Sequence, residues 1–180
     1  HDPYVDNKSP VGIDGLLDDD SLSSRGVLRS IIGDRSEFIL RADYSDIDRS
    51  SGAYKPTLLT TAGAPSPSAG GVVLPSDPFE MNISLADPFT EQTTWGASAE
   101  LSFELSPTLD LVSLTGYRDL DIDLKEDTDG SNLDALVTKL QEEQNQLSEE
   151  LRLNYKDDKL SWVAGLYYLT EEHKSSVNIN

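Results

Sequence analysis

Six acidic side chains crowd one short stretch of the chain, and closely spaced carboxylates are the groups from which proteins build calcium sites. They are Asp119, Asp121, Asp123, Glu126, Asp127 and Asp129. An EF-hand calcium loop places glycine sixth and glutamate twelfth, and the sequence from Asp127 to Gly130 does not start such a loop. We therefore expect solvated loop charge here rather than a metal site.

Residues for acid–base or nucleophilic catalysis are scarce. The chain has no cysteine, and its only histidines, His1 and His173, lie near its two ends. A thiolate zinc site, a disulfide framework and a cysteine nucleophile are therefore excluded. No nucleophile, base and orienting acid can be assembled around either histidine. The sequence predicts a protein that is not an enzyme and that carries neither a metal nor a cofactor.

Composition restricts the possible partners. The chain has 33 acidic and 14 basic residues, and a net charge of −19 disfavours binding to the nucleic-acid backbone, which depends on clustered lysine and arginine. A length of 180 residues with 37% hydrophobic content would suit an ordinary soluble domain. The longest apolar run, Trp162 to Leu169, is far shorter than the roughly 18 residues of a membrane-spanning helix, so a helical membrane protein is excluded.

Apolar and polar residues alternate with the period of a β-strand over six segments. The predicted strands are 22–33, 37–48, 94–105, 109–123, 146–155 and 160–174. Each is close to, or longer than, the roughly 9–11 residues that a tilted strand needs to cross a bilayer. Half-buried strands of a soluble β-sandwich would alternate in the same way, so the pattern alone leaves both architectures open.

The connections between these segments alternate between short and long. The short ones are about 33–36, 106–108 and 156–159, and the long ones are about 1–21, 49–93 and 124–145. Outer-membrane barrels have short periplasmic turns and longer extracellular loops, whereas soluble sandwiches follow no such rule. The loop lengths therefore favour an antiparallel, up-and-down transmembrane β-barrel fragment with the long loops outside the cell.

One long connection contains a helical pattern. Apolar residues recur at i, i+3, i+4 and i+7 after Ser131, at Leu133, Leu136, Val137 and Leu140. This spacing predicts a short amphipathic loop helix over about 132–143. A longer helix continuing through Glu150 fits less well, because the step from Leu151 to Leu153 is typical of a strand.

Charged residues that share one face of the predicted strands are candidates to line a barrel lumen. They are Arg41, Asp43, Glu100, Glu150 and Arg152. Simple cross-strand charge pairing is the alternative interpretation. Arg118 is ambiguous because it shares a face with Val112 and Leu114. Either the strand has left the bilayer at that point, or a bulge resets the alternation.

Four aromatic residues are candidates for the girdles that mark the two surfaces of a membrane. They are Trp95, Tyr117, Trp162 and Tyr168. Trp162 lies just after a predicted tight turn, which suits the periplasmic girdle. The alternative is that these residues are core aromatics of a soluble sheet.

Three phrases in the second half of the chain resemble recurring strand phrases of the TonB-dependent outer-membrane receptor barrel. They are LVSLTGYRD at 111–119, LSEELRL at 147–153 and LSWVAGLYY at 160–168. YVDN at 4–7, SRGVLR at 24–29 and LRADY at 40–44 are weaker matches. The resemblance covers about 1–48 and 94–174.

This resemblance implies a large barrel whose lumen is filled by an N-terminal plug. It also implies the binding and active import of a scarce ligand, most often a ferric siderophore, with outer-membrane lipid and lipopolysaccharide, the plug and the TonB energy-coupling complex as partners. Since the smallest closed barrels have 8 strands, we expect residues 1–180 to be part of such a barrel domain, without the plug and the remaining strands. The second hypothesis is a secreted or periplasmic β-sandwich that binds carbohydrate or protein.

Overall fold

The structure is a computed structural model that describes residues 2–52, 75–133 and 135–180. In these ranges the chain is all-β, and no helix is present that could cross a membrane. A six-stranded sheet consists of β3 (Asp20–Ile32), β4 (Ser36–Arg49), β6 (Phe89–Ser106), β7 (Leu109–Asp127), β8 (Val137–Lys156) and β9 (Ser161–Ile179). A small sheet consists of β2 (Gly15–Leu16), β1 (Val5–Asn7) and β5 (Glu80–Met81).

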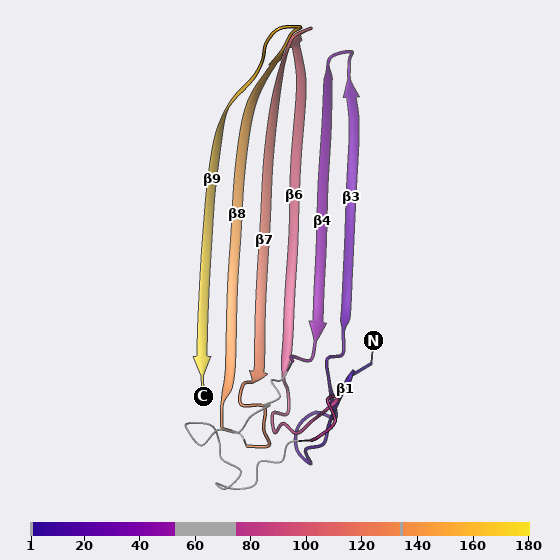
Figure 1. The fold of residues 1–180 in the computed structure, drawn as a ribbon, viewed down its shortest axis with the longest axis vertical. Helices are drawn as coiled ribbons and strands as arrows, with labels where there is room; N and C mark the ends of the chain where they lie inside the picture. The colour runs from indigo at the N-terminus through magenta and orange to yellow at the C-terminus, as the bar shows by residue number, and fades with distance from the viewer. Residues whose placement is uncertain (1, 53–74, 134) are drawn as a thin grey trace.

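The six long strands lie side by side in chain order, and every neighbouring pair is antiparallel. Three tight turns lie at one end of this sheet, while the described parts of the long connections, the small sheet and both ends of the described chain lie at the other (Figure 1). The predicted six-stranded antiparallel fold is confirmed, as is the alternation of short and long connections. Residues 53–74 of the predicted 49–93 connection lie outside the described residues.

The strands are longer than predicted, mainly at the end away from the tight turns. β6, β7, β8 and β9 contain 18, 19, 20 and 19 residues. A tilted strand crosses a bilayer in roughly 9–11 residues. About half of each of these four strands is therefore long enough to span a membrane, and the other half projects beyond that length.

The predicted loop helix over 132–143 is wrong. Ser131 to Leu133 form bends, and β8 begins at Val137 and continues without interruption. Leu140 is directly paired with Leu124 of β7 and Val177 of β9. The segment pairs through its backbone with a strand on each side and makes these apolar cross-strand contacts. Together they outweigh the helical preference that the local apolar spacing indicated.

Two of the tight turns show why the chain reverses where it does. Gly33 has a φ of +65°, a left-handed conformation that glycine adopts without strain. In the turn before β9, Asp157 accepts hydrogen bonds from the backbone N–H groups of Lys159 and Leu160, each at 2.7 Å. These bonds hold the pKa of Asp157 below its ordinary value. The turns are thus closed by their own residues.

A separate hydrophobic core lies at the opposite end, in what we call the loop layer: the described residues 2–19, 75–88, 128–133 and 135–136. Its buried side chains are Val5, Leu16, Met81 and Ile83. The Asn7 side chain donates to the carbonyl oxygens of Ile13 and Ile83 at 2.8 and 3.1 Å, and accepts from the Ile83 N–H at 3.0 Å. Segments far apart in sequence are therefore joined in one folded layer.

The six-stranded sheet has no comparable core. Within the described residues no second sheet packs against either of its faces, and the small sheet lies at its end (Figure 1). Of the apolar side chains on its strands, Val112 is buried, whereas Leu166 is 76% exposed. A β-sandwich buries one sheet face against another, so the described residues do not contain a sandwich core.

Close backbone approach at Gly165 generates a first prediction. A Cβ atom there would lie 2.7 Å from the carbonyl oxygen of Leu151, whereas a Cβ atom at Gly26, also in a strand, would have no neighbour within 4 Å. We expect Gly165→Ala to destabilise the sheet by about 1–3 kcal/mol and Gly26→Ala to change it by less than about 1 kcal/mol. Denaturant unfolding in detergent measures both changes, and equal effects would contradict this packing argument.

Candidate functional site

The register of the six-stranded sheet determines which side chains share a face. Successive residues of a strand point to opposite faces, and directly paired residues of neighbouring strands point to the same one. Pairing is regular from β3 to β9 except for one irregularity between Glu104 and Ser106. Each face can therefore be followed across all six strands, and we call them the polar face and the apolar face.

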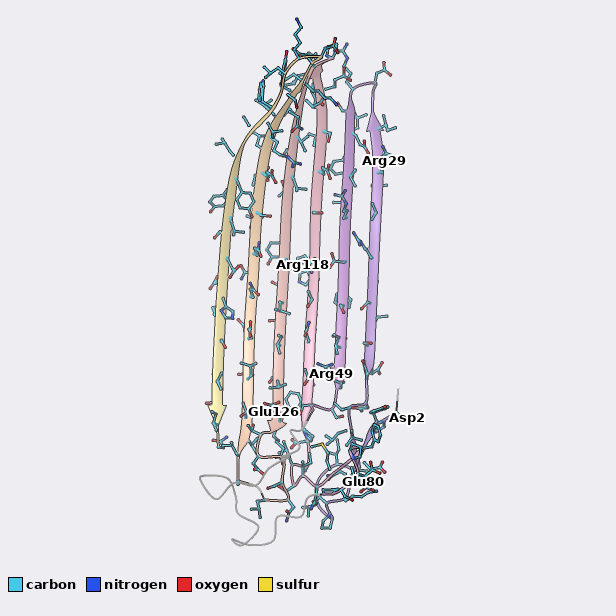
Figure 2. All side chains as sticks on the ribbon, viewed as in Figure 1. Asp2, Arg29, Arg49, Glu80, Arg118 and Glu126 are labelled. Carbon is cyan, nitrogen blue, oxygen red and sulfur yellow. The ribbon has the colours of Figure 1, made fainter. Side chains whose placement is uncertain are left out.

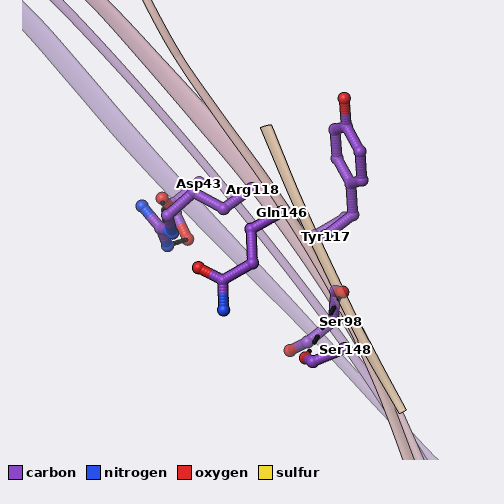
Figure 3. Close-up of a pocket in the computed structure, with 8 residues that line it drawn as sticks. Asp43, Ser98, Tyr117, Arg118, Gln146 and Ser148 are labelled. Atoms are coloured by element: carbon purple, nitrogen blue, oxygen red, sulfur yellow. Dashed lines mark hydrogen bonds and ion pairs between the residues drawn. The ribbon is translucent and has the colours of Figure 1, made fainter. Parts of the chain in front are cut away.

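The predicted site residues separate onto these two faces. Arg41, Asp43, Glu100, Glu150 and Arg152 lie on the polar face, and Trp95, Tyr117, Trp162 and Tyr168 lie on the apolar face. Figure 3 shows the division locally, because Tyr117 projects from the side opposite to Arg118 and Gln146. The register thus keeps the two predicted groups apart, while their lumen-facing and membrane-facing roles stay predictions.

A row of aromatic side chains crosses the apolar face part-way along the strands. We call Tyr44, Trp95, Tyr117 and Tyr168 the distal row, because they lie farther from the tight turns than a second row. Tyr44 and Trp95 are direct partners, and the ring centroids of Trp95 and Tyr117 are 5.0 Å apart. The positions of the row can be compared on β7. Trp95 pairs directly with Asp119 of β7. Tyr168 pairs with Glu149 of β8, which in turn pairs with Thr115 of β7. From β6 to β9 the row therefore moves from position 119 to position 115, toward the tight turns.

This drift has the size expected for a flat boundary that cuts across tilted strands. On strands about 4.8 Å apart and tilted by about 40°, a plane parallel to the membrane crosses each strand about 4 Å farther along than it crosses the strand before. This displacement is a little over one residue. Three strand spacings separate β6 from β9, so a drift of about four residues is expected. A membrane–water interface is such a boundary, and tyrosine and tryptophan concentrate there.

The proximal row, nearer the tight turns, consists of Phe38, Phe103, Tyr155 and Trp162. Tyr155 and Trp162 are direct partners, and their rings stack with centroids 5.5 Å apart. On β6, only Ala97, Ala99 and Leu101 lie on this face between the two rows. The step from Trp95 to Phe103 corresponds to about 20 Å along the normal of a membrane for strands tilted by about 40°. Outer-membrane barrels carry an apolar band about 25 Å tall.

Beyond the distal row the same face becomes acidic. Its carboxylates include Asp20, Asp46, Asp48, Glu91, Asp119, Asp121, Asp123, Glu143 and Glu172. Asp119, Asp121 and Asp123 lie in the strand predicted over 109–123, and in the structure they belong to β7, which continues to Asp127. In the described ranges, no three potential metal-binding side chains come together. The apolar band therefore ends at the distal row.

Glu149 is the charged side chain that lies within the apolar band. Its carboxylate accepts hydrogen bonds from the hydroxyl groups of Ser113, at 3.0 Å, and Thr115. These partners lie on the neighbouring strand and on the same face. The carboxylate is thus hydrogen-bonded within the sheet, which lowers the cost of placing it beside apolar side chains.

Charges on the polar face pair mostly across strands. Arg41 of β4 donates to Glu100 of β6 at 3.0 Å, and Arg118 of β7 donates to both carboxylate oxygens of Asp43 at 3.1 Å. Arg41 and Asp43 therefore have separate partners, in the cross-strand arrangement that was the alternative to a lumen-facing role. These side chains are partly exposed, so each pair contributes under about 1 kcal/mol in water.

Arg118 is a site residue that the sequence left ambiguous. No bulge occurs near it, because β6 and β7 pair without interruption from Phe89 to Glu104. It therefore shares the polar face with Val112 and Leu114, and Figure 2 places it midway along the strands. Its guanidinium reaches across Gly96, where a Cβ atom would lie 3.1 Å from Nη2. Glycine at 96 thus leaves room for the ion pair.

A shallow hollow of about 200 Å³ opens beside this ion pair (Figure 3). Three small residues in one cross-strand row, Ser98, Gly116 and Ser148, form its floor, with Arg118 and Gln146 beside them. On the same face Glu150 and Arg152 form an ion pair at 3.3 Å along β8. The charged side chains named here therefore neutralise one another within the polar face.

Asp127, at the end of β7, joins the loop layer to the sheet. Its side chain is 2% exposed and accepts hydrogen bonds from the backbone N–H groups of Gly130, at 2.9 Å, Ser84 and Leu85. Burial, with a smaller contribution from the nearby charge of Asp129, raises the pKa of Asp127 to about 6. Nothing in the sequence distinguished this carboxylate from its solvated neighbours, because its burial depends on a distant segment.

Further bonds tie the loop layer to the strand ends. The carboxylate of Asp18 accepts from the backbone N–H of Ser50 at 2.6 Å and from its hydroxyl group, and these bonds lower the pKa of Asp18. Ser51 donates to the carbonyl oxygen of Lys125 at 2.7 Å, and the Lys125 ammonium pairs with Asp87. The ends of β3, β4 and β7 are thus held together through polar contacts.

Comparisons with known proteins find a likeness in fold. No protein-family model matches the chain, and no curated protein sequence matches it. A crystal structure of the ferric yersiniabactin uptake receptor FyuA from Yersinia pestis matches all of this chain with a TM-score of 0.72 and 16% sequence identity. The chain spans 26% of the length of that receptor chain. The six-stranded sheet therefore has the fold of part of a larger receptor.

The two faces of β6 give a second prediction, from adjacent residues. Leu101 lies on the apolar face between the aromatic rows, and Ser102 lies on the polar face. If the apolar face contacts lipid, Leu101→Arg should destabilise the protein by about 2–4 kcal/mol, because it would place a charge in lipid, and Ser102→Arg should cost much less. Urea unfolding in lipid vesicles measures both. A larger effect at Ser102 would reverse the assignment of the faces.

The buried Asp127 carboxylate gives a third prediction. Because its pKa is raised in the folded state, protonation favours the folded loop layer, so stability should rise as pH falls from 7 toward 4.5. The gain is at most about 3 kcal/mol. Hydrogen exchange at the Ser84, Leu85 and Gly130 amides, corrected for intrinsic rates, measures this gain. Asp127→Asn should remove the pH dependence, and protection that weakens on acidification would contradict the prediction.

Proposed function

We propose that this chain forms part of the barrel of a TonB-dependent outer-membrane receptor that captures and actively imports a ferric siderophore. The observation that carries the proposal is the likeness in fold between the whole chain and an uptake receptor for a ferric siderophore. The aromatic rows support it independently, because they bound a band of the height and tilt that a membrane requires.

In this proposal the bilayer covers the apolar face between the two aromatic rows. Trp162 lies at the periplasmic girdle, and Trp95, Tyr117 and Tyr168 lie at the girdle nearer the cell exterior. The tight turns then lie in the periplasm and the loop layer outside the cell, in contact with lipopolysaccharide. Import depends on the plug and the TonB energy-coupling complex, and no chemical conversion of the ligand is required.

The polar face then lines the lumen. Arg41, Asp43, Glu100, Glu150 and Arg152 would face the plug, and their mutual pairing leaves few unbalanced charges for a passing ligand. Val112 and Leu114 lie on the same face, and apolar wall residues are better suited to contact with a protein plug than with a water-filled channel. The lumen wall is therefore proposed as a docking surface and not as the ligand site.

A fourth prediction tests import directly. A strain that lacks the gene should lose growth on at least one ferric siderophore when iron is limiting, and the intact gene should restore that growth. A complemented strain without the inner-membrane TonB complex is the matched control and should not recover. The outer-membrane fraction should contain the protein.

Two results would count against the proposal at different levels. Recovery of the protein in the soluble periplasm would reject the barrel itself. Growth that is normal on every ferric chelate but lost on an oligosaccharide would keep the receptor and reject the siderophore.

A further inference from the structure

Two aromatic side chains of the loop layer remain exposed beside its closed core. Tyr4 is 65% and Phe79 52% exposed, although Val5, which follows Tyr4, and Met81, two residues after Phe79, are buried. The two rings meet edge to face, with centroids 5.4 Å apart and planes at 84°. We call this pair the aromatic corner, because the two ring planes are nearly perpendicular and both side chains are exposed.

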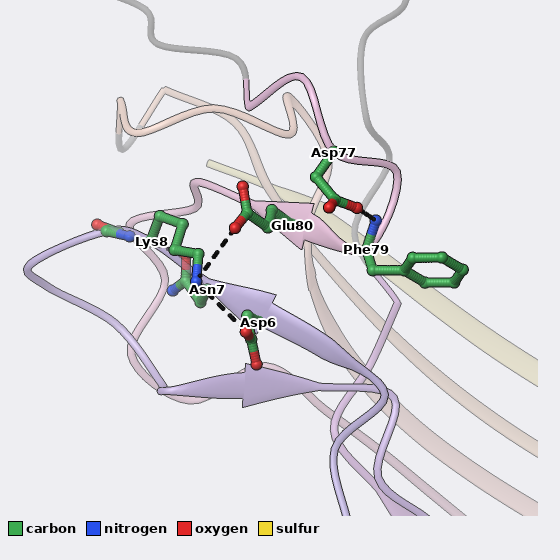
Figure 4. Close-up of polar contacts among 7 residues, drawn as sticks. Asp6, Asn7, Lys8, Asp77, Phe79 and Glu80 are labelled. Atoms are coloured by element: carbon green, nitrogen blue, oxygen red, sulfur yellow. Dashed lines mark hydrogen bonds and ion pairs between the residues drawn. The ribbon is translucent and has the colours of Figure 1, made fainter.

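The backbone holds both members of the corner in place. The Tyr4 N–H donates to the carbonyl oxygen of Leu16 at 2.9 Å, and the carbonyl oxygen of Phe79 accepts from the Asp6 N–H at 3.0 Å. The Phe79 N–H donates to the carboxylate of Asp77 at 2.9 Å. Figure 4 shows the Phe79 ring projecting away from the small sheet. The backbone positions from which both rings project are therefore fixed before a ligand binds, which lowers the cost of ordering them.

The surroundings of the corner are acidic. The described ranges of the loop layer contain nine acidic residues and one basic residue, Lys8. Lys8 lies 3.3 Å from both Asp6 and Glu80, so its charge is already neutralised (Figure 4). These carboxylates raise the pKa of Lys8. The electrostatic environment therefore repels anions and attracts cations.

We propose that the aromatic corner binds an organic cation, an alkylated or quaternary ammonium group. The negative faces of aromatic rings attract such cations within about 6 Å of the ring centroid, and perpendicular rings let one cation contact two faces. The nearby carboxylates add long-range attraction without the desolvation that a direct ion pair would need. A neutral apolar group of the same shape would bind through the burial of apolar surface alone, without the attraction between a cation and the ring faces or the carboxylates.

The experiment compares two probes of the same shape on the complete protein in detergent. Choline carries a quaternary ammonium group, and 3,3-dimethylbutan-1-ol replaces it with a neutral tert-butyl group. Saturation-transfer NMR titrations measure both affinities. We expect choline to bind at least about fivefold more tightly, the contribution of one or two cation–π contacts at an exposed site.

Matched variants assign the effect to the rings. Phe79→Leu and Tyr4→Leu should each weaken choline binding about two- to fivefold, whereas Tyr4→Phe, which keeps the ring, should not. Val11→Ala, at another exposed apolar residue of the loop layer, is the control for unspecific change. Unchanged amide protection at Ser84 and Leu85 would show that the loop layer of each variant is folded.

Three outcomes would overturn the proposal: no choline binding, equal binding of the neutral probe, or full binding by both leucine variants. Equal binding of the two probes would instead indicate an apolar contact surface for a protein. None of these outcomes bears on iron import or on outer-membrane location, so the failure of this inference can be told from the failure of the proposed function.

Discussion

Backbone pairing in one register is the constraint on which the rest of the structure depends. A slip of one residue between two strands would move every side chain of a strand to the other face. Trp95 would then join the ion pairs, and Arg41 would enter the apolar band. Turn residues such as Gly33 hold the register at one end. Arg118 holds it in the middle by reaching two strands away, across Gly96, to Asp43.

Strand positions and faces could be predicted from the sequence because alternation is local. Arg118 shows the limit of that information, since only the observed pairing of β6 and β7 excludes a bulge beside it. The partners of Arg41 and Asp43 could not be predicted either, because they depend on which residues of distant strands lie opposite each other. The helix predicted over 132–143 failed for the same reason: its apolar spacing is local, whereas the pairing of Leu140 with two other strands is not.

Asp127 illustrates how burial can change the chemistry of a residue that looks ordinary in the sequence. It belongs to a run of acidic residues, most of which remain accessible to water. Folding brings the backbone of Ser84 and Leu85 onto its carboxylate, more than 40 positions away in the chain. A group that seemed to be solvated charge thus becomes the junction between the sheet and the loop layer, and its charge becomes costly.

The loop layer and the six-stranded sheet differ in how much of their apolar surface they bury. The loop layer buries Leu16 and Ile83 completely, as a water-exposed fold must. The sheet leaves Leu166 76% exposed, which is unfavourable in water but costs nothing in lipid. In lipid, a backbone N–H or C=O group without a hydrogen-bond partner is energetically costly. In the described sheet, β3 and β9 each have one edge without a neighbouring strand. In the proposed receptor both edges pair with further strands, so membrane insertion and closure of the barrel are a single requirement.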